Sequence, residues 1–216
     1  MKNINIIVDN ATCLKGDNLI FDKISFNISN GEILFITGPN GCGKTTLIRS
    51  LCGIQHLENG CIKINNVNIN NLECNILENL VYIGHNNSLS ENLTTYENLE
   101  YLNKFDLSNK DEFISNSNKI LKFFGISKYK NYLVSELSQG NKKKVALSRL
   151  LFTNKKIWVL DEPLSFLDED SINNLIKLFL DHIASGGLIV TSTHIDFSNY
   201  FEKSKYLKMI GINNNE

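Results

Sequence analysis

The stretch that most restricts the fold of this chain is GPNGCGKTT, residues 38–46, which follows the apolar run GEILFITG and opens the helical pattern GKTTLIRSLCG. It matches the spacing G-x-x-x-x-G-K-[ST] of a phosphate-binding loop, and a strand before it and a helix after it are the setting that gives this spacing meaning. Its glycines let the backbone turn tightly, so that successive N–H groups converge on phosphate oxygens. A chance glycine-rich turn is the alternative, but strand, helix and every required residue stand in order.

The residues of this loop have separate chemical tasks. The helix that begins near Gly43 directs its positive dipole end towards the phosphates. Lys44 supplies a point charge for the β- and γ-phosphates, and the hydroxyl of Thr45 is placed to ligate Mg²⁺. The predicted nucleotide-binding residues of the loop are Gly38, Pro39, Asn40, Gly41, Cys42, Gly43, Lys44, Thr45 and Thr46.

A pair of carboxylates ends the apolar strand KIWVLDEP, residues 156–163. Asp161 at the strand tip can hold Mg²⁺ through water, and Glu162 beside it can polarise an attacking water molecule. The alternative is that the two acids only cap the next helix. Beside a phosphate loop, we predict Asp161 as a metal ligand and Glu162 as a catalytic residue.

Strand-length apolar runs alternate with helical periodicity along the rest of the chain, which indicates an α/β fold. GCIKINNVNI, residues 60–69, has the alternation of an exposed antiparallel strand, whereas the pattern from Thr94 to about Tyr132 is helical. We therefore predict a single domain over residues 1–216. It consists of a P-loop NTPase core of the RecA-like type, an antiparallel β subdomain and an inserted helical lobe at about 88–148. Further strands are expected at 19–29, 31–38, 79–85 and 188–194, and further helices at 139–152 and 170–185.

The length, charge and composition of the chain indicate which classes of protein it can belong to. The chain has 216 residues, 42% of them hydrophobic, which suits one compact domain or one domain with a side lobe. Its net charge of −1 gives no electrostatic case for nucleic-acid binding. No targeting signal is visible, and no window approaches the roughly 18 apolar residues of a membrane span. The five cysteines form no CxxC pair, so free thiols in a reducing cytosol are expected.

Five motifs in order resemble the set that defines ATP-binding-cassette ATPases: GPNGCGKTT, LSQGNKKKVALSRL, WVLDEP, LSFLD and TSTH. Other P-loop classes fit less well, because a GTPase should carry N-K-x-D and SNKDEF has the wrong spacing, while a small-molecule kinase has no need of LSQGN. The resemblance implies ATP and Mg²⁺ as cofactors. It also implies a head-to-tail homodimer that holds two ATP molecules between one subunit's phosphate loop and the other's signature.

The resemblance assigns roles residue by residue. Ser138 and Gly140 of the signature would present a hydroxyl and a backbone N–H to the γ-phosphate held by the opposite subunit. Asp168 of LSFLD would lie at the dimer seam. His194 of TSTH would be the switch histidine that contacts the γ-phosphate, and it joins Glu162 and Lys44 as a predicted catalytic residue.

The chain departs from the family pattern at several positions. Gln139 stands where the signature usually has glycine, and Asn141 stands where it has glutamine. The aromatic residue that normally stacks on adenine would fall near Lys15. Asn86 takes the place of the Q-loop glutamine, which senses Mg²⁺ and the γ-phosphate, so we predict that Asn86 contacts both.

The loop YIGHNNSLSENLTTYENL, residues 82–99, is similar to the form this loop takes in the branch of the family that serves haem export in cytochrome c maturation. That similarity implies an ATPase subunit that docks under separate integral membrane subunits, peripherally, on the cytoplasmic face of the inner membrane. Two alternatives stay open: the ATPase of another small exporter, for drugs or lipoprotein release, or a soluble ATP-dependent switch.

Two further features invite functional interpretations that we set aside. His85 could suggest a haem ligand, but a single histidine with no partner ligand nearby in sequence favours a role in loop geometry, and no direct haem contact is expected. The lysine run 142–144 is expected to be a solvated helix face, with contact to acidic loops or lipid headgroups as the alternative.

Overall fold

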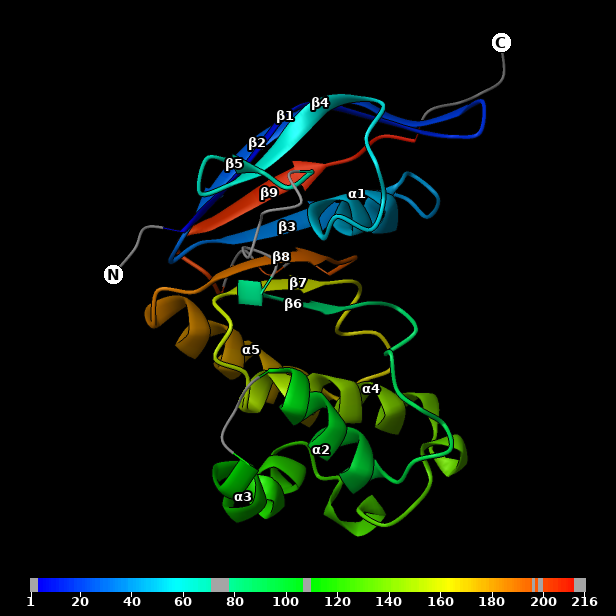
Figure 1. Ribbon diagram of the computed structural model, residues 1–216, viewed down its shortest axis with the longest axis vertical. Coiled ribbons are helices and arrows are strands. Elements are labelled where there is room, and N and C mark those ends of the chain that lie inside the picture. The colour runs from blue at the N-terminus through cyan, green and yellow to red at the C-terminus, as the bar shows by residue number, and fades with distance from the viewer. Residues whose placement is uncertain (1–3, 71–77, 107–109, 196, 198–199, 212–216) are drawn as a thin grey trace. The chain divides into compact units, whose positions relative to one another are not determined.

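The computed structural model describes residues 4–70, 78–106, 110–195, 197 and 200–211 (Figure 1). The chain divides into two compact units. The first, which we call the core unit, comprises Met1–Tyr82, Lys156–Glu162 and Leu180–Glu216. The second, which we call the helical unit, comprises Ile83–Lys155 and Pro163–Phe179.

A five-stranded sheet forms the centre of the core unit, in the order β6-β7-β8-β3-β9. Its strands are β3 (Ile33–Thr37), β6 (Leu80–Ile83), β7 (Ile157–Leu160), β8 (Leu188–Ser192) and β9 (Ser204–Lys208). Strands β7, β8, β3 and β9 run parallel to one another. Every residue of β7 and β8 is buried, as expected for central strands covered on both faces. The edge strand β9 is not among the strands predicted from the sequence.

A four-stranded antiparallel sheet forms the second layer of the core unit, in the order β2-β1-β4-β5. Its strands are β1 (Asn5–Lys15), β2 (Asn18–Ser29), β4 (Asn59–Ile64) and β5 (Val67–Asn68). The single strand predicted over residues 60–69 is in fact two strands. They are joined at Asn65 and Asn66, whose φ angles of 52° and 65° suit a tight hairpin turn.

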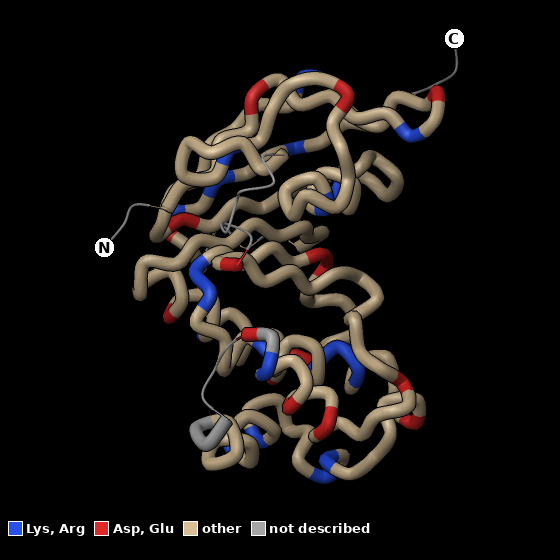
Figure 2. Tube along the Cα trace, viewed as in Figure 1, with Lys and Arg blue, Asp and Glu red and all other residues tan. Residues whose placement is uncertain are grey.

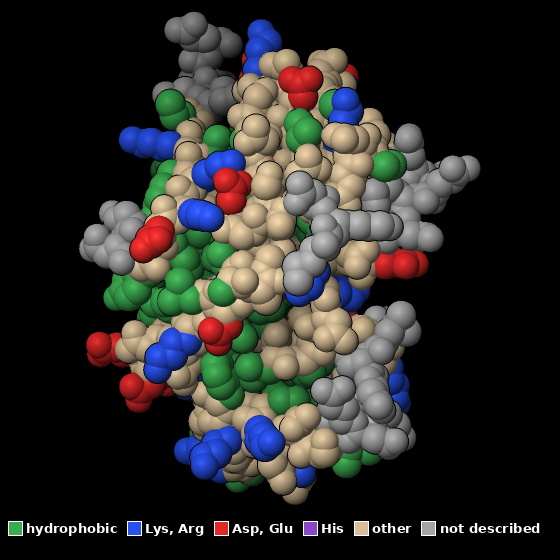
Figure 3. All heavy atoms as spheres, turned by 90° about the vertical axis from the view of Figure 1, so that its left-hand side faces the viewer, with side chains coloured by type: hydrophobic (Ala, Val, Ile, Leu, Met, Phe, Trp, Pro, Cys, Tyr) green, Lys and Arg blue, Asp and Glu red, His purple; other side chains and the backbone are tan. Residues whose placement is uncertain are grey.

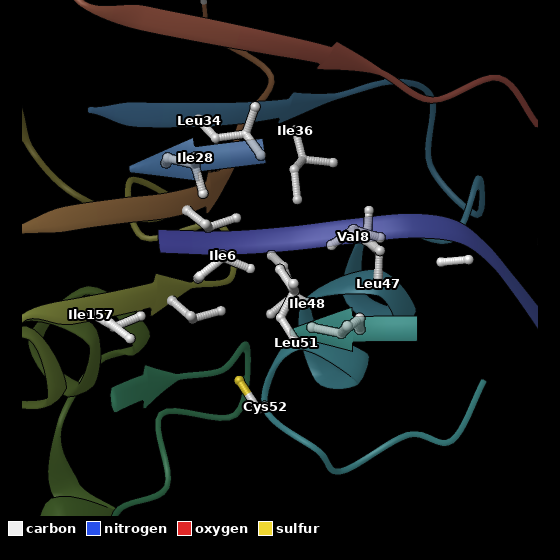
Figure 4. Close-up of a cluster of buried hydrophobic side chains, with 14 of the residues drawn as sticks. Ile6, Val8, Ile28, Leu34, Ile36, Leu47, Ile48, Leu51, Cys52 and Ile157 are labelled. Atoms are coloured by element: carbon white, nitrogen blue, oxygen red, sulfur yellow. The ribbon is translucent and has the colours of Figure 1, made fainter. Parts of the chain in front are cut away.

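One apolar cluster joins these layers to helix α1 (Lys44–Leu51) (Figure 4). Ile6 and Ile28 come from the antiparallel sheet, Ile36 from β3 and Leu47 from α1, and all four are fully buried. Burial of each such side chain stabilises the fold by about 1.5–3 kcal/mol. The packing therefore fixes α1 against the sheet, and with it the loop that connects β3 to α1.

The helical unit contains α2 (Thr95–Phe105), α3 (Lys110–Phe123) and α4 (Gln139–Ser148), with 3₁₀ turns at Ser127–Tyr129, Val134–Glu136 and Arg149–Leu151. Helix α5 (Glu169–Ala184) begins in this unit and ends in the core unit. A capping box starts α2: the hydroxyl of Thr94 accepts from the N–H of Glu97 at 3.2 Å, and the Glu97 carboxylate accepts from the N–H of Thr94 at 2.8 Å.

Charged residues of both signs are interspersed along the trace in Figure 2. On the face in Figure 3, hydrophobic side chains lie between Lys, Arg, Asp and Glu, and the coloured part of that face carries no extended patch of one sign. Within the described residues, every helix is too short or too polar to cross a membrane.

Candidate functional site

The loop after β3 has a backbone that requires glycine at defined places. Gly38 has a φ of 147°, and a Cβ atom there would lie only 2.4 Å from the carbonyl oxygen of Met209. Gly43 has a φ of 97°, and a Cβ atom there would lie 2.8 Å from Cγ2 of Ile20. The loop is therefore packed closely against β2 and the residue after β9, as well as tightly turned.

Lys44 places its charge inside this loop. The side chain is 6% exposed, and its Nζ donates to the carbonyl oxygens of Gly38 and Pro39, both at 2.9 Å. Helix α1 begins at Lys44 with no side-chain cap and no acidic residue in its first turn. The free N–H groups and positive dipole end of α1 are therefore directed at the same place as the lysine, which suits an anion such as phosphate.

Asp161 is held from two sides. Thr45 Oγ1 donates to Asp161 Oδ2 at 2.9 Å, and Ser192 Oγ donates to Asp161 Oδ1 at 2.8 Å. These groups meet because β3, β8 and β7 are neighbouring parallel strands whose carboxyl ends share one edge of the sheet. A carboxylate and a hydroxyl are hard oxygen donors of the kind Mg²⁺ takes together with water and substrate phosphates. The donors predicted for the metal from the core unit thus fit that ion.

Glu162 lies beside His194. His194 Nε2 is 3.1 Å from Glu162 Oε1, and the glutamate side chain is one quarter exposed. The backbone of Glu162 has a φ of 46°, in the left-handed region, and its N–H donates to Ser192 Oγ at 2.8 Å. The two catalytic candidates at the ends of β7 and β8 are therefore brought together.

Ser192 is a site residue that the sequence reasoning missed. It is fully buried and contacts both Asp161 and Glu162. The sequence shows only a hydroxyl residue at the end of the apolar strand before His194, and the fold alone reveals that this strand lies beside the one that ends in two acids.

Burial and negative charge raise pKa values around Asp161. Burial, with a smaller contribution from the Asp161 carboxylate, raises the pKa of the Cys52 thiol to about 12. Burial also raises the pKa of Tyr82, against the opposing effect of its hydrogen bond with Arg49. Cys52 therefore remains a neutral thiol at physiological pH and is not a nucleophile.

The signature and LSFLD segments come together within the helical unit. Ser138 is the N-cap of α4, exposed, and its Oγ accepts from the N–H of Asn141 at 3.3 Å. A Cβ atom on Gly140 would lie 2.6 Å from the carbonyl oxygen of Phe166. Asp168 accepts from Lys144 Nζ at 2.5 Å. Close backbone packing and one ion pair thus connect the two motifs.

The hydrogen bonds of Asp168 have an electrostatic consequence. Lys144 first, and then the Ser171 side chain, lower the pKa of the Asp168 carboxyl to about 2. The backbone N–H of Ser171, in the first turn of α5, donates to Asp168 Oδ1 at 2.9 Å. Asp168 is therefore a carboxylate at any physiological pH.

Asn86 and His85 lie in an exposed turn directly after β6. Asn87 and Ser88 of the same turn have φ angles of 55° and 52°. Asn86 belongs to the helical unit, and its contact with nucleotide and metal stays a prediction. Lys15, at the place of the adenine-stacking aromatic, is exposed at the end of β1.

The prediction of a solvated face for the lysine run is wrong. Lys143 is 3% exposed. Lys142 pairs with Glu91 at 2.7 Å, and both Lys142 and Lys144 have side chains mostly covered. Through Glu91 and Asp168, the lysine run binds α4 to neighbouring segments of the helical unit. The charge pattern along one helix could not predict these partners.

Comparisons with known proteins agree with this geometry. The family model described as "ABC transporter" matches residues 21–165. The cytochrome c biogenesis ATP-binding export protein CcmA of Photobacterium profundum is 33% identical over 210 residues, covering 92% of this chain and 97% of its own length. CcmA of Nitrosomonas europaea is 37% identical over 186 residues, covering 86% of each chain.

A solved dimeric ATP-binding cassette, in a post-hydrolysis state with ADP and Pi, superposes with a TM-score of 0.79 at 23% identity. The match covers 94% of this chain and 96% of that one. At that level of identity the likeness concerns the fold alone. The predicted α/β P-loop fold, with its antiparallel sheet and its helices, is confirmed.

Proposed function

The chain belongs to the ABC transporter family as an ATP-hydrolysing transporter subunit, and from this premise we propose that it serves cytochrome c biogenesis, in the export of haem or the release of a haem-loaded chaperone. The observation that carries the proposal is the identity of 33% and 37% to two CcmA proteins over most of the chain. The loop of residues 82–99 is the local feature that supports the same assignment, because it has the Gly-His-Asn and Leu-Thr-x-x-Glu-Asn-Leu elements at the strand end.

The core unit would bind the nucleotide through its phosphate loop. Lys44 would exchange its bonds to the loop carbonyls for the β- and γ-phosphates, beside the N–H groups at the start of α1. Thr45 and Asp161 would hold Mg²⁺, with Asn86 as a further contact. When bound, the ion neutralises charge on the phosphate oxygens.

Glu162 would orient the attacking water and draw off its proton, since its carboxylate stands at the strand end beside His194. His194 would hold that carboxylate in place and contact the γ-phosphate. These two residues and Lys44 thus form the proposed catalytic group.

A second copy of the chain would complete the site. Its Ser138 hydroxyl and Gly140 N–H would reach the γ-phosphate, and its Asp168 would lie at the dimer seam. Ser138 uses one lone pair as N-cap acceptor, so its hydroxyl proton stays available for donation to phosphate. The start of α4 adds positive potential there.

The partners proposed beyond the homodimer are separate integral membrane subunits, which would place this chain peripherally on the cytoplasmic face of the inner membrane. Closing and opening of the dimer would move those subunits. We propose no direct contact of the chain with haem, because His85 is a single histidine with no partner ligand nearby in the sequence. We propose no role for nucleic acid, because the net charge is −1.

Depletion of the protein in its native cell tests this function, with covalent haem on c-type cytochromes as the readout. Holo-cytochromes should fall on depletion and return with the wild-type chain but not with Glu162→Gln. Ser117→Ala is the matched control for complementation, because Ser117 is buried in α3 and its hydroxyl bonds only to the carbonyl of Ile114 among the contacts described. Normal holo-cytochrome levels after full depletion would overturn the assignment.

A further inference from the structure

We propose that Ser192 is a positioning residue for ATP hydrolysis, because its single hydroxyl fixes the metal-binding Asp161 and the catalytic Glu162 relative to each other. This inference rests on hydrolysis by the site proposed above and goes beyond it, since Ser192 would touch neither nucleotide nor metal.

The hydroxyl of Ser192 is used in both directions. A serine hydroxyl has one proton to donate and lone pairs to accept with. Ser192 Oγ donates to Asp161 Oδ1 at 2.8 Å and accepts from the backbone N–H of Glu162 at 2.8 Å. Ser192 is fully buried and Asp161 is 1% exposed, so bulk water does not compete for these bonds.

For Asp161 the consequence is a fixed carboxylate plane. Thr45 donates to Oδ2 while Ser192 donates to Oδ1, so one oxygen is held from the first turn of α1 and the other from the end of β8. Only the Thr45 side belongs to the phosphate loop. Loss of the Ser192 hydroxyl would leave the carboxylate free to turn about its last torsion and a buried oxygen with one partner fewer.

For Glu162 the consequence is a strained backbone held in place. A φ of 46° is unusual for a glutamate and costs on the order of 1–2 kcal/mol, so the surroundings must maintain it. The bond from the Glu162 N–H to Ser192 supplies such a constraint, and the resulting backbone places Oε1 3.1 Å from His194 Nε2. A carboxylate displaced by about 1 Å loses about 10²-fold in rate.

The neighbouring hydroxyls cannot take over this role. Thr191 Oγ1 donates to the carbonyl of Ser192 at 3.3 Å. Thr193 Oγ1 donates to the carbonyl of Ile195 at 3.3 Å and accepts from its N–H at 3.0 Å. Both bond within their own segment, whereas Ser192 reaches across to the end of the adjacent strand β7.

Three substitutions at this position test the proposal on the full chain, alone and in membranes with its partner subunits. Ser192→Ala removes the hydroxyl. Ser192→Thr and Ser192→Val are of equal size, and only Thr keeps the hydroxyl. Ser117→Ala controls for the loss of a buried serine hydroxyl elsewhere. The readouts are kcat and KM for ATP hydrolysis, the affinity for ATP without Mg²⁺, and thermal unfolding.

Ser192→Ala and Ser192→Val should lower kcat by about 10- to 100-fold, the usual effect of losing a partner that orients a ligand or catalytic group. Affinity for ATP without Mg²⁺ should stay at the wild-type value in both, and Ser192→Thr should keep most of the wild-type kcat. A merely structural role would instead lower stability and affinity together, and Thr would then give no rescue.

Wild-type kcat in Ser192→Ala would overturn the inference. If Ser192→Ala does not fold, the Thr and Val variants decide at a temperature where both are folded, and equal kcat in the two overturns it. A normal holo-cytochrome level in depleted cells would overturn the cytochrome c role. It would not affect the inference about Ser192, which concerns ATP hydrolysis alone. A wild-type chain that never hydrolyses ATP, even with its partners, would overturn the catalytic site and this inference with it.

Discussion

The two units of the molecule present their functional groups in opposite ways. In the core unit, Lys44 and Asp161 are 6% and 1% exposed, and each is tied by hydrogen bonds to other parts of the same unit. In the helical unit, Ser138 is exposed, and its described bond is the local cap of its own helix. The phosphate-loop half of the proposed ATP site is thus held together by hydrogen bonds within the core unit. The signature half, at Ser138, is exposed to solvent.

The physical reason for this difference is burial. A buried charge needs partners inside the chain, since an unpaired one costs several kcal/mol. Asp161 has such partners in Thr45 and Ser192. An exposed hydroxyl at a helix start has no such need, because water satisfies it, and it can exchange water for a phosphate of another subunit at small cost. The difference is what a site shared between two copies requires.

The largest effect expected is the loss of ATP hydrolysis in Glu162→Gln, which tests the core-unit half of the proposed ATP site. It should bind ATP with wild-type affinity and hydrolyse it about 10³-fold more slowly, because the amide cannot draw the proton from water. Single-turnover hydrolysis with labelled ATP measures this. A wild-type rate in the variant would show that Glu162 is not the base.

The next effect concerns the scaffold of the core unit at acid pH. His182 in α5 stacks on Trp158 of β7, with ring centroids 3.6 Å apart, and its Nε2 is 3.1 Å from the carbonyl of Lys156. Burial, outweighing that hydrogen bond, lowers the pKa of His182 to about 4. A Cβ atom on Gly187 would lie 2.2 Å from the same nitrogen, so the ring fills the space beside the Gly186-Gly187 turn.

The sign of the pH effect follows from this lowered pKa. Between the unfolded value of about 6.5 and the native value of about 4, the unfolded chain binds a proton that the native chain refuses. The contribution of His182 to the free energy of unfolding should therefore be constant above pH 7 and fall by up to about 3 kcal/mol as pH drops to 4. Urea unfolding across that range, in wild type and His182→Gln, measures it. Equal slopes in the two proteins would contradict the prediction.

Ser138→Ala tests the exposed signature half of the proposed ATP site, at the start of α4. It should lower kcat by about 10-fold or more, the value of one hydrogen bond to a charged group. The affinity of the monomer for ATP should not change, because Ser138 would act only on the partner's nucleotide. Equilibrium binding at protein concentrations below dimerisation separates the two quantities, and a loss of monomer affinity would place Ser138 in its own chain's site instead.

The smallest effect is local to the helical unit. Thr94→Ala removes the capping box of α2 and should cost about 1 kcal/mol of stability with no change in nucleotide affinity. Glu97→Gln is the matched control, since glutamine can also close the box. Chemical denaturation measures both variants. If Thr94→Ala weakened nucleotide binding, the helical unit would contribute to the nucleotide site of its own chain.

The phosphate loop, Asp161 and Glu162 could be predicted because each lies in one continuous stretch that carries its own strand and turn signals. Ser192 could not be, since its importance depends on β8 lying beside β7, across 31 residues of sequence. The stacking of His182 on Trp158 depends on the same packing. The hairpin at Asn65 and Asn66 could have been predicted, because asparagine is among the residues favoured where a hairpin turn needs positive φ angles at both central positions.

The most direct test of the shared site is the molecular mass of Glu162→Gln in solution, measured by light scattering with and without ATP. Saturating ATP should double the mass from one chain to two. The additional substitution Ser138→Glu should bind ATP and keep the mass of a single chain, because a carboxylate would face the phosphate. A Glu162→Gln chain that is saturated with ATP and still has the mass of one chain would contradict the proposal that a second copy completes the site.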